Sequence, residues 1–490
     1  MDLVLQRYFL EEALECFGEQ PLIVTSDCRL TYHRIHQYVS ETIRRLEKQD
    51  IEEGDRVAIL SPNNLAYVIL LLAFWRMGVI AVPMSTRWPQ KQIIENLQAI
   101  EAIGIITSKG PAPFQKLPEI RHLFLEDLIP LHYNPSYEGN LESGEPWQDR
   151  DATIIFTSGS SGTPKAVLHT LGNHLFSALG SNRNIRVGPG DRWLLSLPLY
   201  HVGGLAIIFR VILGGGALAI PIPGFPLEEN IGELQVTHVS MVSTQFYRLL
   251  RDFGNNADLS KLKAVLIGGS AIPDHIIREG VKRGLPVFKS YGSTELASQV
   301  TTTHPNDAIE KRFTSGTLLD YRDLQIAEGG EILLKGRTLF RGYVQDRGVV
   351  KAVDKKGWFH TGDIGCLDES GYLHVTGRKD NMFISGGENI QPEEIEENLA
   401  RIEGIKEAIV VPVKHEEFGF RPVAFLKMTS GHRLQFKRIQ EWLEDKLPRF
   451  KIPAHFFPWP KEWDHSSLKP DRKALKEIAE ELVRKEPGRK

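Results

Sequence analysis

The sequence predicts an α/β protein with a large N-terminal body of mixed, largely parallel sheets and helices, and a small mobile α+β C-terminal domain. First, apolar runs typical of buried strands alternate with helix-like periods through most of the chain. Second, a length of 490 residues fits about three compact units, or one large body with a smaller one. Third, the composition changes near residue 377, where a second unit begins.

Three strand-like runs of the body each end at a turn rich in glycine or small polar residues. Residues 56–60 are followed by Ser61-Pro62-Asn63-Asn64. Residues 154–156 lead into a glycine loop, and residues 264–267 lead into Gly268-Gly269-Ser270. The order strand, turn, helix is typical of parallel sheets, whose ligands gather beyond the carboxyl ends of the strands.

The C-terminal unit begins after a polar stretch, residues 377–381, which follows a strand-like run at 372–375. Pro392 and the acids after it mark the start of a helix. Two strand-like runs and a last helix follow, enough for a domain of about 110 residues; they lie at residues 408–413, 422–428 and 475–482. The predicted domains are a body at 1–377, a hinge at 378–381 and a mobile domain at 382–490.

The composition is that of a globular protein, with 41% hydrophobic and 25% charged residues and a net charge of −3. This balance gives no electrostatic reason to expect a nucleic acid or an anionic membrane as partner. The apolar run at residues 68–75 is too short to span a bilayer, so we expect a buried helix there. Cys16, Cys28 and Cys366 are far apart and odd in number, which predicts no disulfide framework and a reducing cytoplasmic location.

The glycine loop is Thr157-Ser158-Gly159-Ser160-Ser161-Gly162-Thr163-Pro164-Lys165. Its glycines let backbone N–H groups converge on an anion, its hydroxyls add donors, and Lys165 adds a positive charge. It is not a Walker A loop, because the spacing is Gly-x-x-Gly-x-x-Lys and no Ser or Thr follows the lysine. Taken alone, such a run is better explained as a flexible surface loop. Its place directly after a buried strand favours phosphate binding.

This loop resembles the signature of the acyl-adenylate-forming (AMP-binding) superfamily, which contains acyl- and aryl-CoA synthetases, luciferases and peptide-synthetase adenylation domains. Further blocks that resemble the family occur in its order over nearly the whole chain. They are Leu30-Thr31-Tyr32, Gly54–Val57, Gly78-Val79, Leu197–His201, Gly268–Ser270, Tyr291–Glu295, Trp358–Asp363, Gly377–Asp380 and Ser385–Ile390. The resemblance implies an enzyme that joins a carboxylic acid to AMP with release of pyrophosphate, and then transfers the acyl group to a thiol.

The resemblance also implies the residues that bind the nucleotide. They are Thr157, Ser158, Gly159, Ser160, Ser161, Gly162, Lys165, Gly268, Gly269, Ser270, Ser290, Tyr291, Gly292, Thr294, Asp363 and Arg378. Glu295 is expected to hold the Mg²⁺ that arrives with ATP, although an acid at a helix start would look the same. Asp363 is expected to accept hydrogen bonds from the ribose hydroxyls, and its alternative is an Asx turn.

Thr294, Glu295, His201 and Lys469 are the predicted catalytic residues. His201 is expected to flank the reacting carboxylate, which is ionised at neutral pH and needs no general base; a packed core histidine is the alternative. Lys469 is expected to lie between the carboxylate and the α-phosphate. The family has a glycine before this lysine where this chain has Leu468, and Lys469 matches better than Lys473.

The resemblance places the hinge at Asp380, for which a linker acid is the alternative, and a channel for coenzyme A at Gly386 and Gly387. The glycines would let the thin pantetheine arm pass close to the backbone. The expected cofactors are therefore ATP, Mg²⁺ and coenzyme A, and the expected partners are small molecules, with a homodimer left open.

Two segments, residues 243–250 and 298–299, resemble the 2-succinylbenzoate–CoA ligases of menaquinone or phylloquinone biosynthesis. That acid has two carboxylates, so one is activated and the other needs hydrogen-bond donors or a cation. Arg248, Ser298 and Gln299 are the candidates beside His201, and a solvated helix arginine is the alternative for Arg248. Another aryl- or acyl-CoA synthetase, or a stand-alone adenylation enzyme that loads a carrier protein, is the alternative function.

Overall fold

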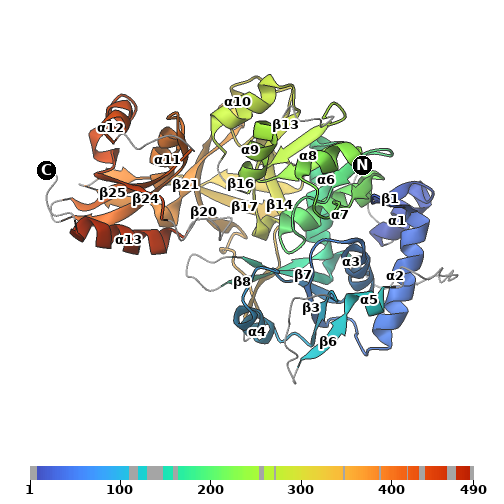
Figure 1. Cartoon of the computed structure of the whole chain (residues 1–490). Coiled ribbons are helices and arrows are strands. Elements are labelled where there is room, and N and C mark those ends of the chain that lie inside the picture. The colour runs from blue at the N-terminus through green and yellow to red at the C-terminus, as the bar shows by residue number, and fades with distance from the viewer. Residues whose placement is uncertain are drawn as a thin grey trace.

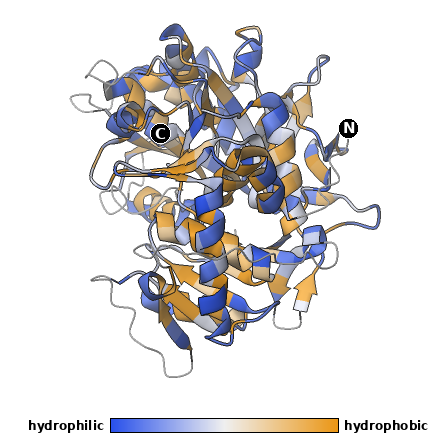
Figure 2. Ribbon diagram, turned by 90° about the vertical axis from the view of Figure 1, so that its right-hand side faces the viewer, coloured by the Kyte–Doolittle hydropathy of each residue, from blue (hydrophilic) through white to orange (hydrophobic). Residues whose placement is uncertain are grey.

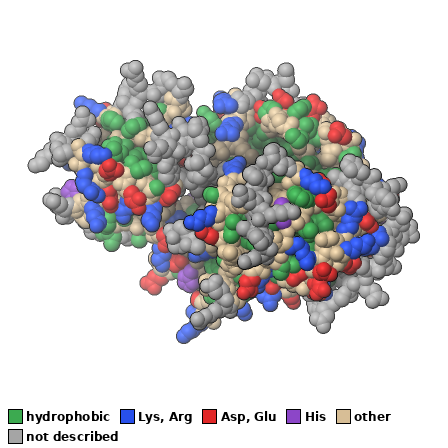
Figure 3. Space-filling view, turned by 60° about the horizontal axis from the view of Figure 1, so that its bottom comes forward, with side chains coloured by type: hydrophobic (Ala, Val, Ile, Leu, Met, Phe, Trp, Pro, Cys, Tyr) green, Lys and Arg blue, Asp and Glu red, His purple; other side chains and the backbone are tan. Residues whose placement is uncertain are grey.

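A computed structural model of the chain shows a large body and a smaller C-terminal lobe (Figure 1). It describes residues 8–109, 120–129, 147–157, 164–252, 259–269, 272–345, 348–385, 388–415, 418–429, 436–460 and 471–485. No helix among these residues is long and apolar enough to cross a membrane. On the face drawn in Figure 3, basic and acidic side chains are interspersed and an indentation separates the two lobes.

The described residues form four sheets, and the two large ones combine parallel and antiparallel strands. One sheet has the order β19 (Gly348–Val350), β18 (Gly342–Gln345), β8 (Lys165–Thr170), β7 (Asp151–Thr157), β4 (Ile80–Pro83), β3 (Arg56–Leu60), β5 (Gly104–Thr107) and β6 (Arg121–Phe124). The other has the order β15 (Thr317–Leu318), β14 (Ser298–Thr302), β13 (Val287–Ser293), β12 (Ala264–Ile267), β11 (His238–Met241), β9 (Arg192–Leu194), β10 (Ala217–Ala219), β1 (Pro21–Val24) and β2 (Arg29–Thr31). The mixed, largely parallel body that the sequence predicts is confirmed.

Helices lie between the two large sheets and on their outer faces. The largest hydrophobic cluster joins strands of both sheets to α2 (Tyr32–Glu47), α3 (Leu65–Met77), α6 (Leu171–Asn184) and α7 (Val202–Gly214), so these helices form the middle layer. The remaining body helices are α1 (Phe9–Phe17), α4 (Gln90–Ala99), α5 (Leu125–Leu128), α8 (Leu227–Glu233), α9 (Ser243–Asp252) and α10 (Asp274–Lys282). In Figure 2 the strands of the body are mainly hydrophobic, as buried strands must be.

The helix α3 confirms the buried helix expected at residues 68–75. Asn64 caps its start by accepting a hydrogen bond from the backbone N–H of Tyr67, and Gly78 ends it in the left-handed conformation. Every residue from Ala66 to Trp75 is buried. A helix that is apolar on all sides is stable only when it is covered on all sides, which explains its place in the middle layer.

A third sheet carries the chain from the body to the C-terminal lobe, and it is wholly antiparallel, unlike the largely parallel pairing predicted for the body. It contains β16 (Arg322–Ile326), β17 (Glu331–Gly336), β20 (Phe359–Leu367) and β21 (Leu373–Arg378). The short helical turn Lys379–Asn381 follows β21 at the predicted hinge.

The C-terminal lobe has the predicted α+β composition. Its sheet contains β23 (Glu388–Ile390), β22 (Phe383–Ser385), β25 (Gly419–Met428), β24 (Ile405–His415) and β26 (His455–Pro458), and its helices are α11 (Pro392–Ala400), α12 (Phe436–Glu444) and α13 (Arg472–Lys485). Arg472 at the start of α13 donates two hydrogen bonds to the carboxylate of Glu396 on α11, at 2.6 and 2.7 Å. The same arginine donates to the carbonyl oxygen of Val410, so it ties α13 to α11 and β24.

The Arg472 to Met substitution is expected to lower the free energy of unfolding of the C-terminal lobe by about 3 kcal/mol, because it leaves the largely buried Glu396 carboxylate without its cation. Chemical denaturation followed by hydrogen exchange of α13 measures this effect. Lys473→Met is the matched control, since Lys473 is exposed on the same helix. An equal loss in both variants would contradict the role of the ion pair.

Candidate active site

The glycine loop connects two antiparallel strands of the body. Thr157 is the last residue of β7, Lys165 is the first of β8, and the two are cross-strand partners. Residues Ser158, Gly159, Ser160, Ser161 and Gly162 lie outside the described residues. A strand therefore follows this loop, not the helix expected from the strand–turn–helix pattern, and residues 166–168 of this strand pair with both β7 and β18.

Lys165, Tyr343 and Glu295 come together from three distant parts of the chain. The Nζ atom of Lys165 lies 5.2 Å from the centre of the Tyr343 ring, and the Tyr343 hydroxyl donates to Glu295 Oε1 at 2.9 Å. Burial and the nearby Glu295 raise the pKa of Tyr343, so its hydroxyl keeps its proton and acts as a donor. The predicted phosphate-side lysine and metal-side carboxylate thus both contact Tyr343, a residue that belongs to none of the sequence blocks.

Glu295 belongs to a strained turn that follows β13. Thr294, Glu295 and Leu296 form one short helical turn, and then Ala297 and Ser298 have φ values of +51° and +117°. Residues other than glycine rarely adopt such backbone conformations, and strain of this kind is common at functional sites. A Cβ atom on Gly292 would lie 1.9 Å from the carbonyl oxygen of Ser298, so the turn requires glycine there.

The Gly292→Ala substitution is expected to destabilise the protein by about 1–3 kcal/mol, because the methyl group collides with backbone that cannot move alone. It should also displace Glu295, so activity should fall further than stability explains. Gly188→Ala is the control, since its added Cβ would come no nearer than 4.0 Å to an Asp191 carboxylate oxygen. Thermal unfolding and pyrophosphate release would measure the two effects, and wild-type behaviour of Gly292→Ala would contradict them.

A second group of predicted residues surrounds Asp363 on β20. The Tyr291 hydroxyl donates to Asp363 Oδ2 at 2.6 Å, and Arg378 donates to Asp363 Oδ1 at 2.9 Å. Arg378 also lies 3.4 Å from Asp380 Oδ2. Burial, together with Asp363, raises the pKa of Tyr291, which keeps this hydroxyl protonated. The Asp363 carboxylate is therefore held in place by two donors, with lone pairs left to accept further hydrogen bonds.

Gly268 and Gly269, two of the predicted nucleotide-binding residues, lie at the carboxyl end of β12, next to the parallel strand β13. Gly268 and Gly269 follow β12, and Gly269 has a φ of +84°. Ser290 of β13 lies beside them, since a Cβ on Gly268 would come 2.8 Å from its hydroxyl oxygen. The predicted residues Ser270, Gly386, Gly387 and Lys469 lie outside the described residues.

Comparison with known proteins agrees with this geometry. The AMP-binding enzyme family matches residues 10–344, more than half of the chain. The chain belongs to the AMP-binding enzyme family. The C-terminal domain of AMP-binding enzymes also matches, at residues 394–462. The resemblance found in the ordered sequence blocks is confirmed.

Individual relatives of this AMP-binding enzyme align over most of its length. The 2-succinylbenzoate–CoA ligase of Oceanobacillus iheyensis is 34% identical over 432 residues, which cover 86% of this chain and 88% of that protein. The same ligase of Bacillus cereus is 30% identical and covers 98% of both chains. Among solved structures, o-succinylbenzoate CoA synthetase (MenE) from Bacillus subtilis in complex with the acyl-adenylate intermediate OSB-AMP is 28% identical with a TM-score of 0.86, over 96% of this chain and 98% of that chain. E. coli MenE with a bound analogue of OSB-AMS is 30% identical with a TM-score of 0.80, over 98% and 99%.

The four residues predicted on the acid side of this AMP-binding enzyme lie in different surroundings. His201 is exposed at the start of α7, and Arg248 is exposed on α9, as the solvated-helix alternative expects. Gln299 is buried, and both ends of its amide are hydrogen-bonded within the protein. Its oxygen accepts from the Ser181 hydroxyl and its nitrogen donates to the Thr302 hydroxyl. Ser298 differs from these, because its hydroxyl lies 3.1 Å from a buried cation, Arg210.

Arg210 on α7 was not among the residues predicted from the sequence. Its side chain is 1% exposed, and its guanidinium lies 5.3 Å from the centre of the Trp193 ring. Among the described residues, no carboxylate lies within ion-pair distance of Arg210, and its Nε has no hydrogen-bond partner. Burial lowers the pKa of Arg210 to about 9, so it is still charged at neutral pH. A lone arginine inside an otherwise apolar helix was the sequence signal that could have found it.

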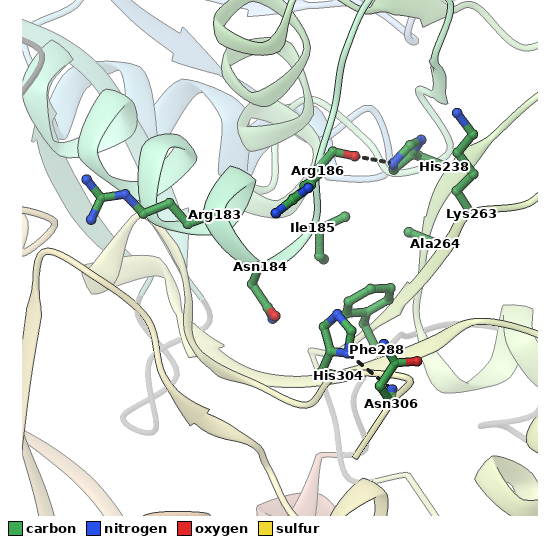
Figure 4. A pocket seen from close by; sticks show the side chains of 10 residues that line it. All are labelled: Arg183, Asn184, Ile185, Arg186, His238, Lys263, Ala264, Phe288, His304 and Asn306. Atoms are coloured by element: carbon green, nitrogen blue, oxygen red, sulfur yellow. Dashed lines mark hydrogen bonds between the residues drawn. The ribbon is translucent and has the colours of Figure 1, made fainter. Parts of the chain in front are cut away.

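A cavity of about 460 Å³ lies on the opposite edge of the nine-stranded sheet (Figure 4). It opens at the amino ends of β11, β12 and β13, whereas the nucleotide-side residues follow the carboxyl ends of these strands. In the view of Figure 4, Arg183 and the Nζ of Lys263 point away from its centre. Both are paired with carboxylates, Arg183 with Asp320 and Lys263 with Asp191. Because it lies at the amino ends of the strands, this cavity is separate from the candidate active site.

Proposed function

We propose that the chain is an AMP-forming acid–CoA ligase. It would convert a carboxylic acid and ATP into an acyl-adenylate and pyrophosphate, and then convert the adenylate and coenzyme A into an acyl-CoA thioester and AMP. The arrangement of Lys165, Glu295 and Asp363 around the turn that follows β13 carries this proposal. A cation, a carboxylate for a metal and an acceptor for ribose are the groups that a Mg·ATP site needs.

In the first half-reaction an oxygen of the acid carboxylate attacks the α-phosphorus of ATP, and the bond to the pyrophosphate oxygen breaks. The acid is already ionised at neutral pH, so the protein needs to position the reactants and offset charge. Lys165 and the glycine loop would bind the β- and γ-phosphates, while Asp363 and Arg378 would hold the ribose. Lys469 would lie between the two anions that react.

Glu295 is the residue that would hold Mg²⁺. Among the described residues, no three His, Cys, Asp or Glu side chains gather into a metal site. Mg²⁺ commonly binds through one or two carboxylates together with phosphate oxygens and water, so a single carboxylate beside the phosphate site fits its chemistry. When bound there, Mg²⁺ would neutralise phosphate charge. The Tyr343 hydroxyl fixes Glu295 by donating to one of its oxygens.

In the second half-reaction the thiol of coenzyme A attacks the acyl carbon, and AMP leaves. We propose that the domain at 382–490 turns about the hinge at 378–381 between the two steps, which removes Lys469 and brings Gly386 and Gly387 to the adenylate. Two ion pairs near the hinge would change in this rotation. Arg378 lies 3.4 Å from Asp380, and Lys379 lies 3.1 Å from Glu331.

We further propose 2-succinylbenzoate as the acid. The names of the relatives support this choice, and so does the buried Arg210–Ser298 pair. An acid with one carboxylate leaves a buried guanidinium without a counter-charge, whereas a dicarboxylate supplies one, directly or through a water. Of the four acid-side predictions, Ser298 and His201 keep their proposed role, and Arg210 takes the place of Arg248.

The test is thioester formation by the purified chain with ATP, Mg²⁺ and coenzyme A, screened over 2-succinylbenzoate, benzoate and fatty acids. We expect 2-succinylbenzoyl-CoA, AMP and pyrophosphate in equal amounts. Preference for another acid would reject 2-succinylbenzoate as the substrate. An adenylate that is not passed to free coenzyme A would favour a carrier protein as the acyl acceptor.

We also propose a cytoplasmic location, which the scarcity of cysteine supports. The homodimer stays a prediction that sedimentation would test.

A further inference from the structure

His169 links the two segments that are proposed to hold the phosphates of ATP. It lies on β8, four residues after Lys165, and its side chain is fully buried. Its Nε2 atom is 2.7 Å from the backbone carbonyl oxygen of Thr294, which is 125 residues away in the sequence. Because a carbonyl oxygen can only accept, Nε2 carries the proton and donates it.

The same face of β8 packs against the residues that follow Thr294. Successive side chains of a strand point to opposite faces, so those of residues 165, 167 and 169 point to the same side of β8. Val167 packs in one hydrophobic cluster with Leu296 and Val300, which follow Thr294. One strand face therefore presents Lys165 at its start, an apolar contact in its middle and a hydrogen-bond donor at its end.

Thr153 and His174 lie on the other side of the His169 ring. Thr153 on β7 is its cross-strand partner, and the Thr153 hydroxyl lies 3.5 Å from His169 Nδ1 and 2.7 Å from His174 Nε2. His174 in turn stacks on Phe209 of α7 with ring centres 5.0 Å apart. Burial lowers the pKa of His169 to about 4, so the ring is neutral at physiological pH and keeps one donor and one acceptor.

We propose that His169 is a positioning residue for adenylate formation: its Nε2–H holds the Thr294 carbonyl and so fixes Thr294 and Glu295 at a set distance from Lys165. The inference rests on the proposed function, since it assumes that these residues bind Mg·ATP. It adds a residue that no sequence block contains. The hydrogen bond acts on the phosphate site alone, so it should matter for ATP and for the first half-reaction and not for the second.

Two amide variants separate this role from a structural one. Glutamine can place its amide N–H where Nε2 lies, whereas asparagine can reach only the place of Nδ1. We expect His169→Asn to raise the KM for ATP, and the Kd for Mg·ATP in calorimetry, by roughly 10-fold or more, as the loss of one buried hydrogen bond implies. We expect His169→Gln to stay within about 3-fold of the wild type. Thioester formation from preformed adenylate should be unchanged in both variants.

His174→Met is the control, because His174 is equally buried but does not touch Thr294. It should lower the melting temperature and leave the KM for ATP unchanged. Equal KM and Kd values for His169→Gln and His169→Asn, or equal losses in both half-reactions, would overturn the proposal. If His169→Asn does not fold, a His169→Gln variant with weakened ATP binding would overturn it. Calorimetry with Mg·ATP needs no acid, so the result holds even if 2-succinylbenzoate is not the substrate.

Discussion

The Lys469→Ala variant will form the acyl-adenylate about 10²–10³-fold more slowly than the wild type, because one preorganised positive charge is lost where two anions react. Its second half-reaction should survive, since Lys469 is expected to leave the site before coenzyme A attacks. Pyrophosphate release measures the first step, and thioester formation from synthetic adenylate measures the second. The split between them is the specific signature of a lysine that serves only one half-reaction.

Lys473→Ala is the matched control for this prediction. Lys473 is the other lysine of the same sequence block, and it is exposed on α13, where it should contribute little to either step. If Lys473→Ala loses adenylation while Lys469→Ala keeps it, the two lysines exchange their assigned roles. If both variants adenylate normally, the charge-offsetting mechanism is wrong.

The Arg210→Met variant will lose about 10²-fold or more in kcat/KM for 2-succinylbenzoate, because the distal carboxylate loses a desolvated cation. A monomethyl ester that leaves the reacting carboxylate free lacks the charge that Arg210 would bind. The variant should therefore use the ester nearly as well as the wild type does. Comparing the two substrates separates loss of recognition from loss of activity.

Arg248→Met is the matched control, since it removes the arginine that was a candidate from the sequence. Arg248 is exposed on α9, so we expect its loss to change kcat/KM for the dicarboxylate by less than about 3-fold. The opposite ranking of the two variants would restore Arg248 to the acid site and leave Arg210 as a structural residue.

The sequence predicted those parts of the site that lie close together in the chain. Tyr291, Thr294 and Glu295 form one sequence block, so the block could be predicted, and the structure places it at the end of β13 and in the turn that follows. Asp363 and Arg378 meet because they are cross-strand partners of β20 and β21. The distance between them in the sequence does not reveal this pairing. Only the family resemblance indicated that both residues belong to the same site.

Contacts between distant elements could not be predicted in this way. Tyr343 reaches Glu295 because β18 pairs with β8, and His169 reaches Thr294 because β8 lies against the turn. Arg210 looked like part of an apolar core helix, and its burial beside Ser298 depends on tertiary packing. The strand β8 was not predicted, because the pattern of strand, glycine turn and helix led us to expect a helix after the loop.

The burial of Arg210 has a consequence for how the resting protein can be probed. A buried cation without a carboxylate among the described residues makes the acid-free state less stable than an apolar core would be. A dianionic ligand that meets this charge should therefore raise the melting temperature even without ATP, by mass action. Differential scanning fluorimetry over a collection of dicarboxylates would rank candidate acids by fit, and Arg210→Met should be the more heat-resistant protein that no longer responds to them.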